Sequence, residues 1–491
     1  ESNPTCERGI VLVDAFSPSH LLYLKRRALT TYNAGVVECF SPKVSRYLLG
    51  QSESSEERSD ILARTMPSSR DSCASWAASL PFEVVGVLCE SDSGGSVAER
   101  LTEWLGLDGE RGNARMSARR DKYLMHKAIK DAGVGGTARG YVCEDPGEAV
   151  AKAAEMGVMD QDDERGVVYD ERTPCVVKPR RGVASDRVFK CTTLQEVAEA
   201  TGEIIGSTSF GNDEVIKDCL VQEFVEGLEV AVDTVTRNGE TKIVAVWDYD
   251  KRQANGAPFV NFATRLVDGA FQPASEDEDL PPLNSTLSGT GGSGVKIKSN
   301  RTSPSSLSSL PRQARYVVVQ KVCDYATSVL QSLEYNWGMA HVEVKVSLPR
   351  NFRKAYKKGS FEPPSVRLIE VNARQHNAEW LQLTQAPGRI VHLSCNREGT
   401  LRRVSHLERI RRMESVVKVE VYEDVEEGKG IAKTVDIRSE KGWVHMLHDD
   451  EEVLERDFVK VMELMETMFE VEEGGEEGRE EGLGEKALNQ P

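Results

Sequence analysis

The chain has 491 residues, of which 39% are hydrophobic, and this length and apolar content predict roughly two to four domains or subdomains around real cores. Its formal net charge of −17 argues against a general nucleic-acid binder, because phosphate backbones are bound by basic patches. No run of residues is long and apolar enough to predict a membrane span. The ten cysteines are scattered and form no CxxC pair, so we expect neither a zinc site nor a dense disulfide framework.

The first hundred residues alternate apolar strands with helices. Strands are expected at 9–14, 35–40 and 82–88, and helices at 18–28 and 97–105. This alternation predicts a parallel sheet in a Rossmann-like α/β domain. The Gly94-Gly95 loop before the second helix either binds a ligand at a helix start or is a plain turn. The Ser/Glu-rich stretch 51–70 is expected to be an exposed loop.

The next part of the chain offers candidate phosphate-binding residues. A helix is expected from Ser117 to Ala132, with Lys122 near its start. A strand that ends at Lys178 leads into the small-residue loop 180–187, which is suited to phosphates although it lacks the Gly-Lys-Ser/Thr of a Walker A motif. Further strands, expected to form an antiparallel sheet, begin near residues 219, 229, 243 and 259.

Two later segments, 341–346 and 366–374, carry the clearest chemical pattern. In both, apolar and polar residues alternate with period two, which predicts strands with one polar face. If the two strands pair, Glu343 and Glu370 can converge on one cation. The polar faces would consist of His341, Glu343 and Lys345 on the first strand and of Glu370, Asn372 and Arg374 on the second, with Ile369, Val371 and Ala373 opposite.

The remaining segments suggest no chemistry of their own. Residues 277–312 are rich in Ser, Gly and Pro and are expected to be a disordered insertion, with a catalytic lid as the alternative. A helix is expected at 317–335, and the basic link 348–364 is either a solvated loop or a site of attraction for a polyanion. Strands are then expected at 415–421, 430–437 and 444–447, and a helix at 452–469, before a Glu/Gly-rich tail.

The order of these parts resembles the ATP-grasp superfamily of carboxylate–amine ligases, and within it the amino-acid-ligase-like branch. The motifs VVKP, VQEFVEGLEV, HVEVKV and IEVNAR stand in family order across about 117–393. The resemblance implies an α/β (α+β ATP-grasp) fold. Its expected parts are a Rossmann-like domain at 1–116, an ATP-grasp domain at 117–395 that contains the insertion, a C-terminal α/β region at 396–470 and an acidic disordered tail at 471–491.

The resemblance also implies residue roles. Lys122 and Lys178 would contact the ATP phosphates, and the loop from Arg181 and Gly182 to Ser185 would fold over them. Glu229 would hold the ribose. The segment along the adenine would be Gln222, Glu223, Phe224 and Val225. The ligands of Mg²⁺ (or Mn²⁺) would be Glu343, Glu370 and Asn372.

For the reacting groups, the resemblance places Arg374 against the transferred phosphoryl group and the carboxylate substrate, with Lys178 as its catalytic partner. The adjacent His376 is either a substrate contact or a structural histidine. A substrate role and a hairpin-loop role are equally open for Lys251, Asn255 and Arg265.

The implied activity is an ATP- and Mg²⁺-dependent ligase that activates a carboxylate, expected to be an amino acid, as an acyl phosphate and joins it to an amine. The alternatives are a biotin-carboxylase-like or purine-pathway enzyme of the same fold, and an ATP-binding regulatory module without turnover. The expected partners are small molecules, with neither nucleic acid nor membrane, and a homodimer is an open possibility. The cytoplasm is the expected compartment, and organelle targeting stays open because the chain begins at Glu1 and not at Met.

Overall fold

The computed structural model describes most of the chain. The described residues are 6–15, 18–92, 94–107, 113, 116–159, 173–182, 185–208, 215–267, 306–307, 310–349, 364–374 and 387–472. None of the helices in these ranges is both long enough and apolar enough to cross a bilayer.

The N-terminal domain is the predicted α/β unit. Its strands β1 (Arg8–Val13), β2 (Ala34–Cys39) and β3 (Glu83–Cys89) form a parallel sheet in the order β2-β1-β3. The apolar run of β1 is buried, as expected for a parallel strand covered on both faces. The helices of this domain are α1 (Pro18–Tyr32), α2 (Pro42–Gln51), α3 (Ser55–Arg64), α4 (Arg70–Ala78) and α5 (Gly95–Trp104).

Two expectations for local structure are wrong. The stretch 51–70 is not a loop: it contains α3, because Ser54 caps the helix by accepting from Glu57 N and the helix buries Ile61. The single helix expected from Ser117 is two helices, α6 (Met116–Arg120) and α7 (Lys122–Asp131). The break occurs at Asp121, whose carboxylate accepts two backbone N–H groups of α7, and it makes Lys122 the first residue of the new helix.

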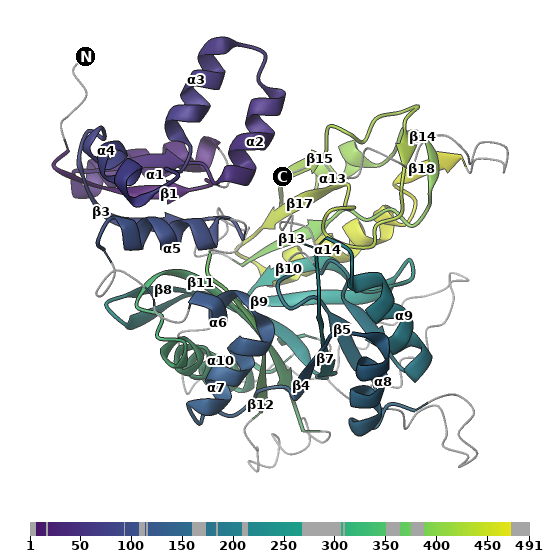
Figure 1. Ribbon diagram of the computed structural model, residues 1–491. Coiled ribbons are helices and arrows are strands. Elements are labelled where there is room, and N and C mark those ends of the chain that lie inside the picture. The colour runs from purple at the N-terminus through teal and green to yellow at the C-terminus, as the bar shows by residue number, and fades with distance from the viewer. Residues whose placement is uncertain are drawn as a thin grey trace.

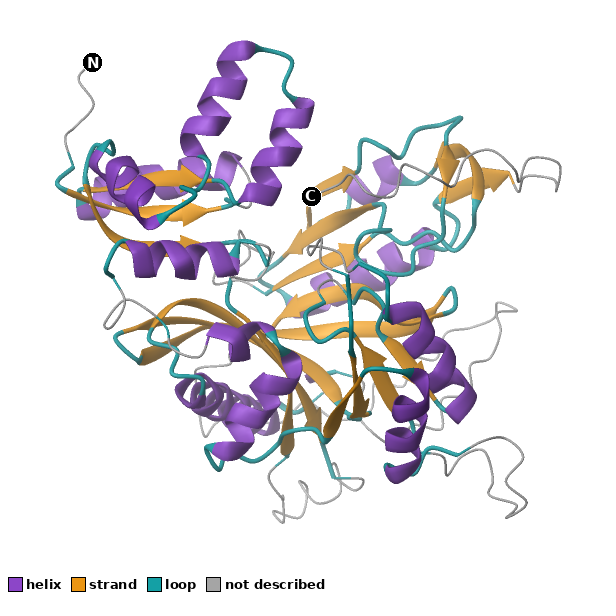
Figure 2. Ribbon diagram, viewed as in Figure 1, coloured by secondary structure: helices purple, strands orange, loops and turns teal. Residues whose placement is uncertain are grey.

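The middle of the chain forms two sheets that face each other (Figures 1 and 2). The smaller sheet has the order β4-β7-β5-β6 and is antiparallel, with α8 (Pro146–Glu155) and α9 (Leu194–Ile204) packed against it. Its strands are β4 (Gly140–Cys143), β5 (Cys175–Lys178), β6 (Phe189–Cys191) and β7 (Cys219–Glu223).

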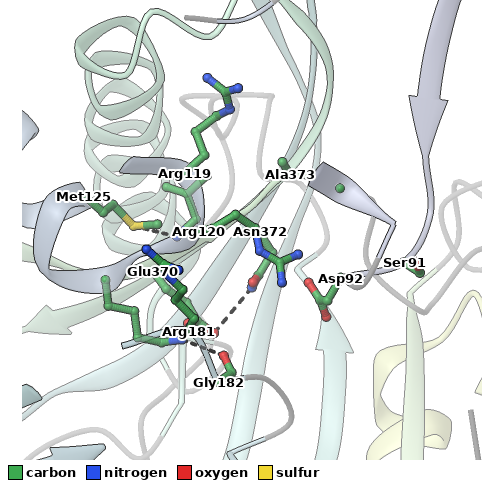
Figure 3. Close-up of a pocket in the computed structure, with 13 residues that line it drawn as sticks. Ser91, Asp92, Arg119, Arg120, Met125, Arg181, Gly182, Glu370, Asn372 and Ala373 are labelled. Atoms are coloured by element: carbon green, nitrogen blue, oxygen red, sulfur yellow. Dashed lines mark hydrogen bonds and ion pairs between the residues drawn. The ribbon is translucent and has the colours of Figure 1, made fainter. Parts of the chain in front are cut away.

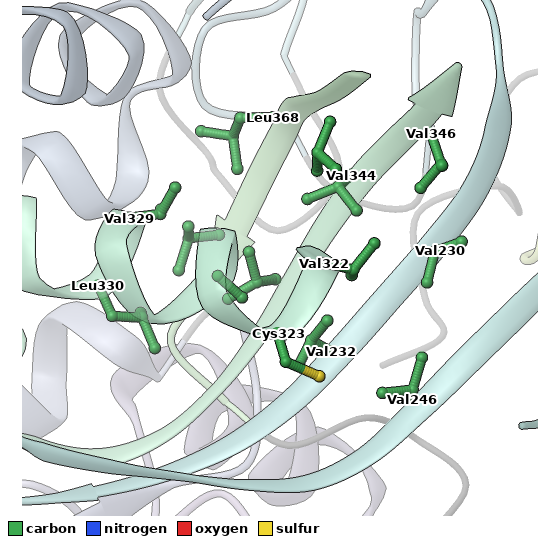
Figure 4. Packing of buried hydrophobic residues seen from close by; sticks show 14 of the residues in the cluster. Val230, Val232, Val246, Val322, Cys323, Val329, Leu330, Val344, Val346 and Leu368 are labelled. Atoms are coloured by element: carbon green, nitrogen blue, oxygen red, sulfur yellow. The ribbon is translucent and has the colours of Figure 1, made fainter. Parts of the chain in front are cut away.

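The larger sheet has eight strands in the order β12-β11-β8-β9-β10-β13-β17-β15. Helix α10 (Arg312–Ser332) covers one face, and its apolar side packs on valines of the strands (Figure 4). The sheet continues from strands that precede residue 396 into strands of the C-terminal region. Its strands are β8 (Leu228–Arg237), β9 (Glu240–Ala254), β10 (Ala257–Leu266), β11 (Trp337–Ser347), β12 (Ser365–Asn372), β13 (Gly388–His392), β15 (Val416–Val421) and β17 (Gly442–Leu447).

The predicted alternation on β11 is confirmed, and that on β12 needs a correction. The side chains of Val342, Val344 and Val346 lie fully buried on the core face. On β12, Glu370 pairs with Glu343 and Leu368 pairs with Val344, so Ile369 between them has no pairing partner on β11. Ile369 is also not part of the buried core. This β-bulge leaves Glu370 on the polar face, which is a common use of bulges beside active sites.

The C-terminal region adds a second small sheet in the order β16-β14-β18. The strand expected at 430–437 is only β16 (Gly430–Ile431), and the helix expected to reach Phe469 is α14 (Glu451–Met465). Phe469 instead begins β18 (Phe469–Glu472), which pairs with β14 (Gly399–Val404). The short helix α13 is Leu407–Arg411.

The insertion expected at 277–312 ends earlier than predicted, because the side chains of Leu307 and Leu310 are buried in the main core. The rest of that insertion up to residue 305, and the tail from residue 473, lie outside the described residues.

Candidate active site

A narrow charged pocket lies where four separate elements meet (Figure 3). It is lined from the loop before α5, from α6 and α7, from the loop after β5 and from the end of β12, and it has a volume of about 20 Å³. Arginine, lysine, aspartate and glutamate side chains fill most of it. The pocket therefore joins the N-terminal domain, the smaller sheet and the larger sheet at a single point.

The two predicted carboxylates meet at this point. Glu343 on β11 and Glu370 on β12 stand directly opposite each other in the antiparallel register. The amide Nδ2 of Asn372 lies 3.4 Å from Oε1 of Glu343 and 3.4 Å from Oε1 of Glu370. The prediction that the two strands pair and bring these carboxylates together is therefore confirmed.

Two lysines face the carboxylates. Lys122 Nζ lies 2.7 Å from Oε2 of Glu370 and donates a hydrogen bond of 2.7 Å to the carbonyl of Gly182 in the loop after β5. Lys178, at the end of β5, is buried. Burial and the neighbouring charge of Lys122 lower the pKa of Lys178 to about 8. Burial opposes the charge on Glu370, but Lys122 and Lys178 outweigh it and hold the pKa of Glu370 at about 2.

Behind Glu343 lies a hydrogen-bonded network that the sequence did not point out. His341 Nε2 is 3.3 Å from Glu343 Oε1, and its Nδ1 is 2.7 Å from Asp233 Oδ1. Trp247 Nε1 donates to the other oxygen of Asp233 at 2.6 Å, and the Tyr249 hydroxyl lies 3.1 Å from His341 Nε2. All these side chains are buried or nearly so. Through His341 they orient one oxygen of Glu343, Oε1.

The predicted ribose ligand, Glu229 on β8, lies between two lysines. Lys345 stands opposite it in register, with Nζ 2.8 Å from Glu229 Oε2, and Lys251 pairs with Oε1. Burial opposes the charge on Glu229, but the two lysines hold its pKa at about 2. One substrate candidate, Lys251, thus lies beside a predicted nucleotide contact.

The predicted adenine segment runs along β7 and just beyond it. Gln222 and Val225 are buried, and Glu223 forms an ion pair with Arg367 of β12. The ring of Phe224 stacks on Phe259 with centroids 6.4 Å apart, and Lys190 Nζ lies 4.2 Å from the Phe224 ring centroid. This segment therefore presents backbone and an aromatic face between the two sheets.

The loop after β5 is anchored by α7. Arg181 lies 3.6 Å from Asp121, the residue that caps α7, and Arg180 binds the same carboxylate. Arg181 and Gly182 line the pocket, whereas Ser185 is exposed and has a positive φ of 57°.

The predicted reacting arginine, Arg374, meets a partner from another domain. Its Nε lies 2.9 Å from Oδ1 of Asp92, in the loop that follows β3. The sequence signal for Asp92 was its place in the Ser/Asp/Gly loop before α5, where a ligand loop was one of two interpretations. Only the three-dimensional structure brings this loop to Arg374.

The substrate candidates Asn255 and Arg265 do not line the charged pocket. Asn255 donates from its amide to the carbonyls of Cys395 (3.1 Å) and Thr434 (2.6 Å), so it fastens the β9–β10 turn to the C-terminal region. Arg265 forms an ion pair with Glu451 at the start of α14. A substrate role for these two residues stays a prediction, and His376 lies outside the described residues.

Comparison with known proteins agrees with this geometry. A family model described as an ATP-grasp domain matches residues 171–262. Dapdiamide A synthase of Enterobacter agglomerans is 24% identical over 249 residues, which make up 51% of this chain and 54% of that protein. The chain thus spans about half the length of this curated relative.

Solved structures resemble the chain over nearly its whole length. The L-amino acid ligase from Bacillus licheniformis aligns with a TM-score of 0.55 and 14% identity, over 96% of this chain and 99% of that one. A carboxyaminoimidazole ribonucleotide synthase from Aspergillus clavatus, solved with ATP, aligns with a TM-score of 0.53 and 12% identity, over 94% and 99%. These likenesses establish the fold.

Proposed function

We propose that this chain, which carries an ATP-grasp domain within an ATP-grasp fold, is an ATP- and Mg²⁺-dependent carboxylate–amine ligase. It activates the carboxylate of an amino acid as an acyl phosphate and joins it to an amine, with release of ADP and phosphate. The observation that carries this proposal is the set of two lysines facing two carboxylates, each residue from a different element.

The nucleotide lies between the two sheets in this proposal. Lys122 and Lys178 bind its phosphates, because both are cations beside the loop after β5. Lys122 is bonded to the Gly182 carbonyl of that loop, and Lys178 directly precedes the loop. The loop from Arg181 to Ser185 closes over those phosphates. The adenine lies along the segment 222–225 and the ribose hydroxyls bind Glu229, which then shares its oxygens between the ribose and its lysines.

The donor set at Glu343 and Glu370 fits a magnesium ion. Mg²⁺ prefers oxygen ligands, and in nucleotide sites it takes one or two carboxylates together with phosphate oxygens and water. Two carboxylates and the amide of Asn372 match such a partial shell, once the Asn372 amide turns over to present its oxygen. Bound there, the ion would neutralise charge on the phosphoryl group as it moves.

The chain's own residues then supply the rest of the chemistry. Arg374 holds the substrate carboxylate and stabilises the oxyanion that forms when the amine attacks the acyl phosphate. Asp92 beside it fits the ammonium group of the same amino acid, since a zwitterion matches adjacent opposite charges. No protein nucleophile is required. Burial raises the pKa of the Cys89 thiol, the cysteine nearest this loop, to about 12, which makes it a poor nucleophile.

Two alternatives predict different results. A carboxylase-like enzyme of this fold would release phosphate in the presence of bicarbonate and without an amino acid. A regulatory module would bind ATP tightly and release no phosphate with any substrate, and the complete set of Glu343, Glu370, Asn372 and Arg374 argues against that loss of turnover.

The cellular compartment and the oligomeric state are also part of this proposal. All ten cysteines are free thiols, which supports a reducing compartment such as the cytoplasm. Whether the chain forms a homodimer is tested by light scattering during size-exclusion chromatography.

The proposed function is tested by measuring ADP release from purified protein with ATP, Mg²⁺ and amino acids supplied singly and in pairs. We expect a specific amino acid or pair to raise ADP release well above the rate with ATP alone. Release driven by bicarbonate alone, or no stimulation by any amino acid, would contradict the proposal.

A further inference from the structure

We propose that the cavity between β3, α5 and the start of β11 is the specificity pocket for the side chain of the amino acid whose carboxylate is held at Arg374, and that it selects large apolar side chains. This inference rests on the proposed function for the claim that Arg374 holds the carboxylate of an amino acid. The claim about the side chain of that amino acid rests on the cavity itself. Among the residues that line the cavity, Gly95 and Ala373 also line the charged pocket.

The cavity is large enough for such a side chain. Its volume is about 250 Å³, against about 20 Å³ for the charged pocket beside it. An apolar cavity of about 150 Å³ inside a protein is sufficient to bind benzene. The space therefore accommodates a leucine, methionine or phenylalanine side chain, whereas glycine or alanine would leave most of it unfilled.

The two spaces adjoin each other, because Gly95 and Ala373 line both of them. Ala373 directly precedes Arg374, and Gly95 begins α5 just after the loop that carries Asp92. An amino acid whose carboxylate and ammonium groups are held by Arg374 and Asp92 therefore has its side chain within reach of the cavity. The carboxyl end of β3 also forms one wall, which is where open parallel sheets usually bind ligands.

Apolar and aromatic side chains form much of the wall. They include Val87, Ala98, Tyr335, Trp337 and Met339. The two polar ring groups are occupied: the Tyr335 hydroxyl donates to the Met339 carbonyl at 2.6 Å, and Trp337 Nε1 donates to the Val87 carbonyl at 3.1 Å. Neither is left to bind a polar ligand.

Most polar groups of the lining have partners inside the protein. Thr102 donates back to the Ala98 carbonyl at 2.8 Å, and the Asn113 amide is bonded to the backbone of Asn336 and Trp337. Glu99 pairs with Arg119 through Oε1, and its Oε2 is buried without a hydrogen-bond partner. Glu103 is exposed and lies at the edge. A polar side chain in the cavity would lose its water and gain few partners, which is costly, and an apolar one would gain by burial.

Two variants of opposite sense test the proposal. Ala98→Leu fills the cavity from α5, and Met339→Ala enlarges it from β11. Binding of L-phenylalanine, L-leucine and glycine is measured by isothermal titration calorimetry with ADP and Mg²⁺ present, and ADP release is measured in parallel. We expect wild type to prefer phenylalanine and leucine over glycine, because each methylene-sized difference in such a pocket is worth about 10- to 200-fold.

Ala98→Leu is expected to lower the preference for phenylalanine over glycine at least 10-fold, and Met339→Ala to shift preference toward the larger side chain. Arg100→Leu is the matched control, because Arg100 lies on the exposed side of the same helix. An unchanged preference in both cavity variants, or a wild type that binds glycine as well as phenylalanine, would overturn the proposal. Binding that follows the cavity without ADP release would support the pocket and reject the ligase function.

Discussion

Replacement of Glu370 by glutamine tests the central claim about the charged pocket. The substitution keeps the shape of the side chain and removes its charge. Lys122, 2.7 Å away, and Lys178 then lose the carboxylate that balances them, and the hydrogen bond from Asn372 loses its charged acceptor. Turnover and stability are both expected to change, and each change has a size that follows from the structure.

The stability effect follows from the pKa of Glu370, which lies at about 2 instead of the ordinary 4.5. At about 1.36 kcal/mol for each pKa unit, this corresponds to roughly 3 kcal/mol in favour of the charged form. A carboxylate with a lowered folded-state pKa stabilises the fold above its unfolded-state pKa, and that contribution is lost as the pH falls from about 4.5 to about 2. At pH 7 the glutamine variant should therefore unfold at a lower urea concentration.

The catalytic effect should be similar in free energy to the effect on folding. Removal of one electrostatic group that stabilises a transition state typically lowers the rate by about 10²- to 10³-fold. We expect a loss of this size in kcat/KM for amino-acid-dependent ADP release, and weaker calorimetric binding of a Mn²⁺ complex of a non-hydrolysable ATP analogue.

Glu240→Gln is the control, since Glu240 is an exposed glutamate at the start of β9. If Glu370→Gln kept kcat/KM within about threefold of wild type, the metal and phosphate assignment of this pocket would be refuted. An equal and small stability change in both variants would refute the electrostatic reasoning.

Three further variants probe neighbouring groups. Because the pKa of Lys178 is about 8, ATP-analogue affinity should fall above that pH in wild type and much less in Lys178→Arg, and parallel pH profiles would contradict this. His341→Asn should weaken Mn²⁺–nucleotide binding about 10- to 100-fold without loss of folding, as expected for a residue that orients a ligand, and unchanged binding would reject its role. Asp92→Asn should raise the KM for the amino acid about tenfold with little change in the KM for ATP, and the reverse pattern would place Asp92 elsewhere.

The meeting of Glu343 and Glu370 could be predicted from the sequence, because period-two alternation fixes which residues share a strand face. The bulge at Ile369 was not predicted, although the consecutive apolar residues Leu368 and Ile369 interrupt the alternation there. The break before Lys122 had a local signal in Asp121, a good helix cap, which the apolar periodicity of the surrounding residues obscured.

Contacts between distant elements were the least predictable. Asp92 reaches Arg374, and Asp233 reaches His341, only because strands and loops far apart in the chain are neighbours in space. For Asn255, which lies in a polar turn, the sequence left a substrate role and a hairpin-loop role equally open. That turn is bonded to backbone carbonyls about 140 and 180 residues further along, and neither composition nor local spacing encodes such a contact.

The continuity of the large sheet also bears on how the protein is made. Strand β13 pairs with β10 on one side, but its other edge is completed only by β17, whose residues are synthesised about 50 positions later. During translation β13 is therefore a bare edge strand with free hydrogen-bonding groups beside an uncovered apolar cluster. A ribosome that stalls within this interval would release a chain prone to aggregate, although every residue of the charged pocket has already been made.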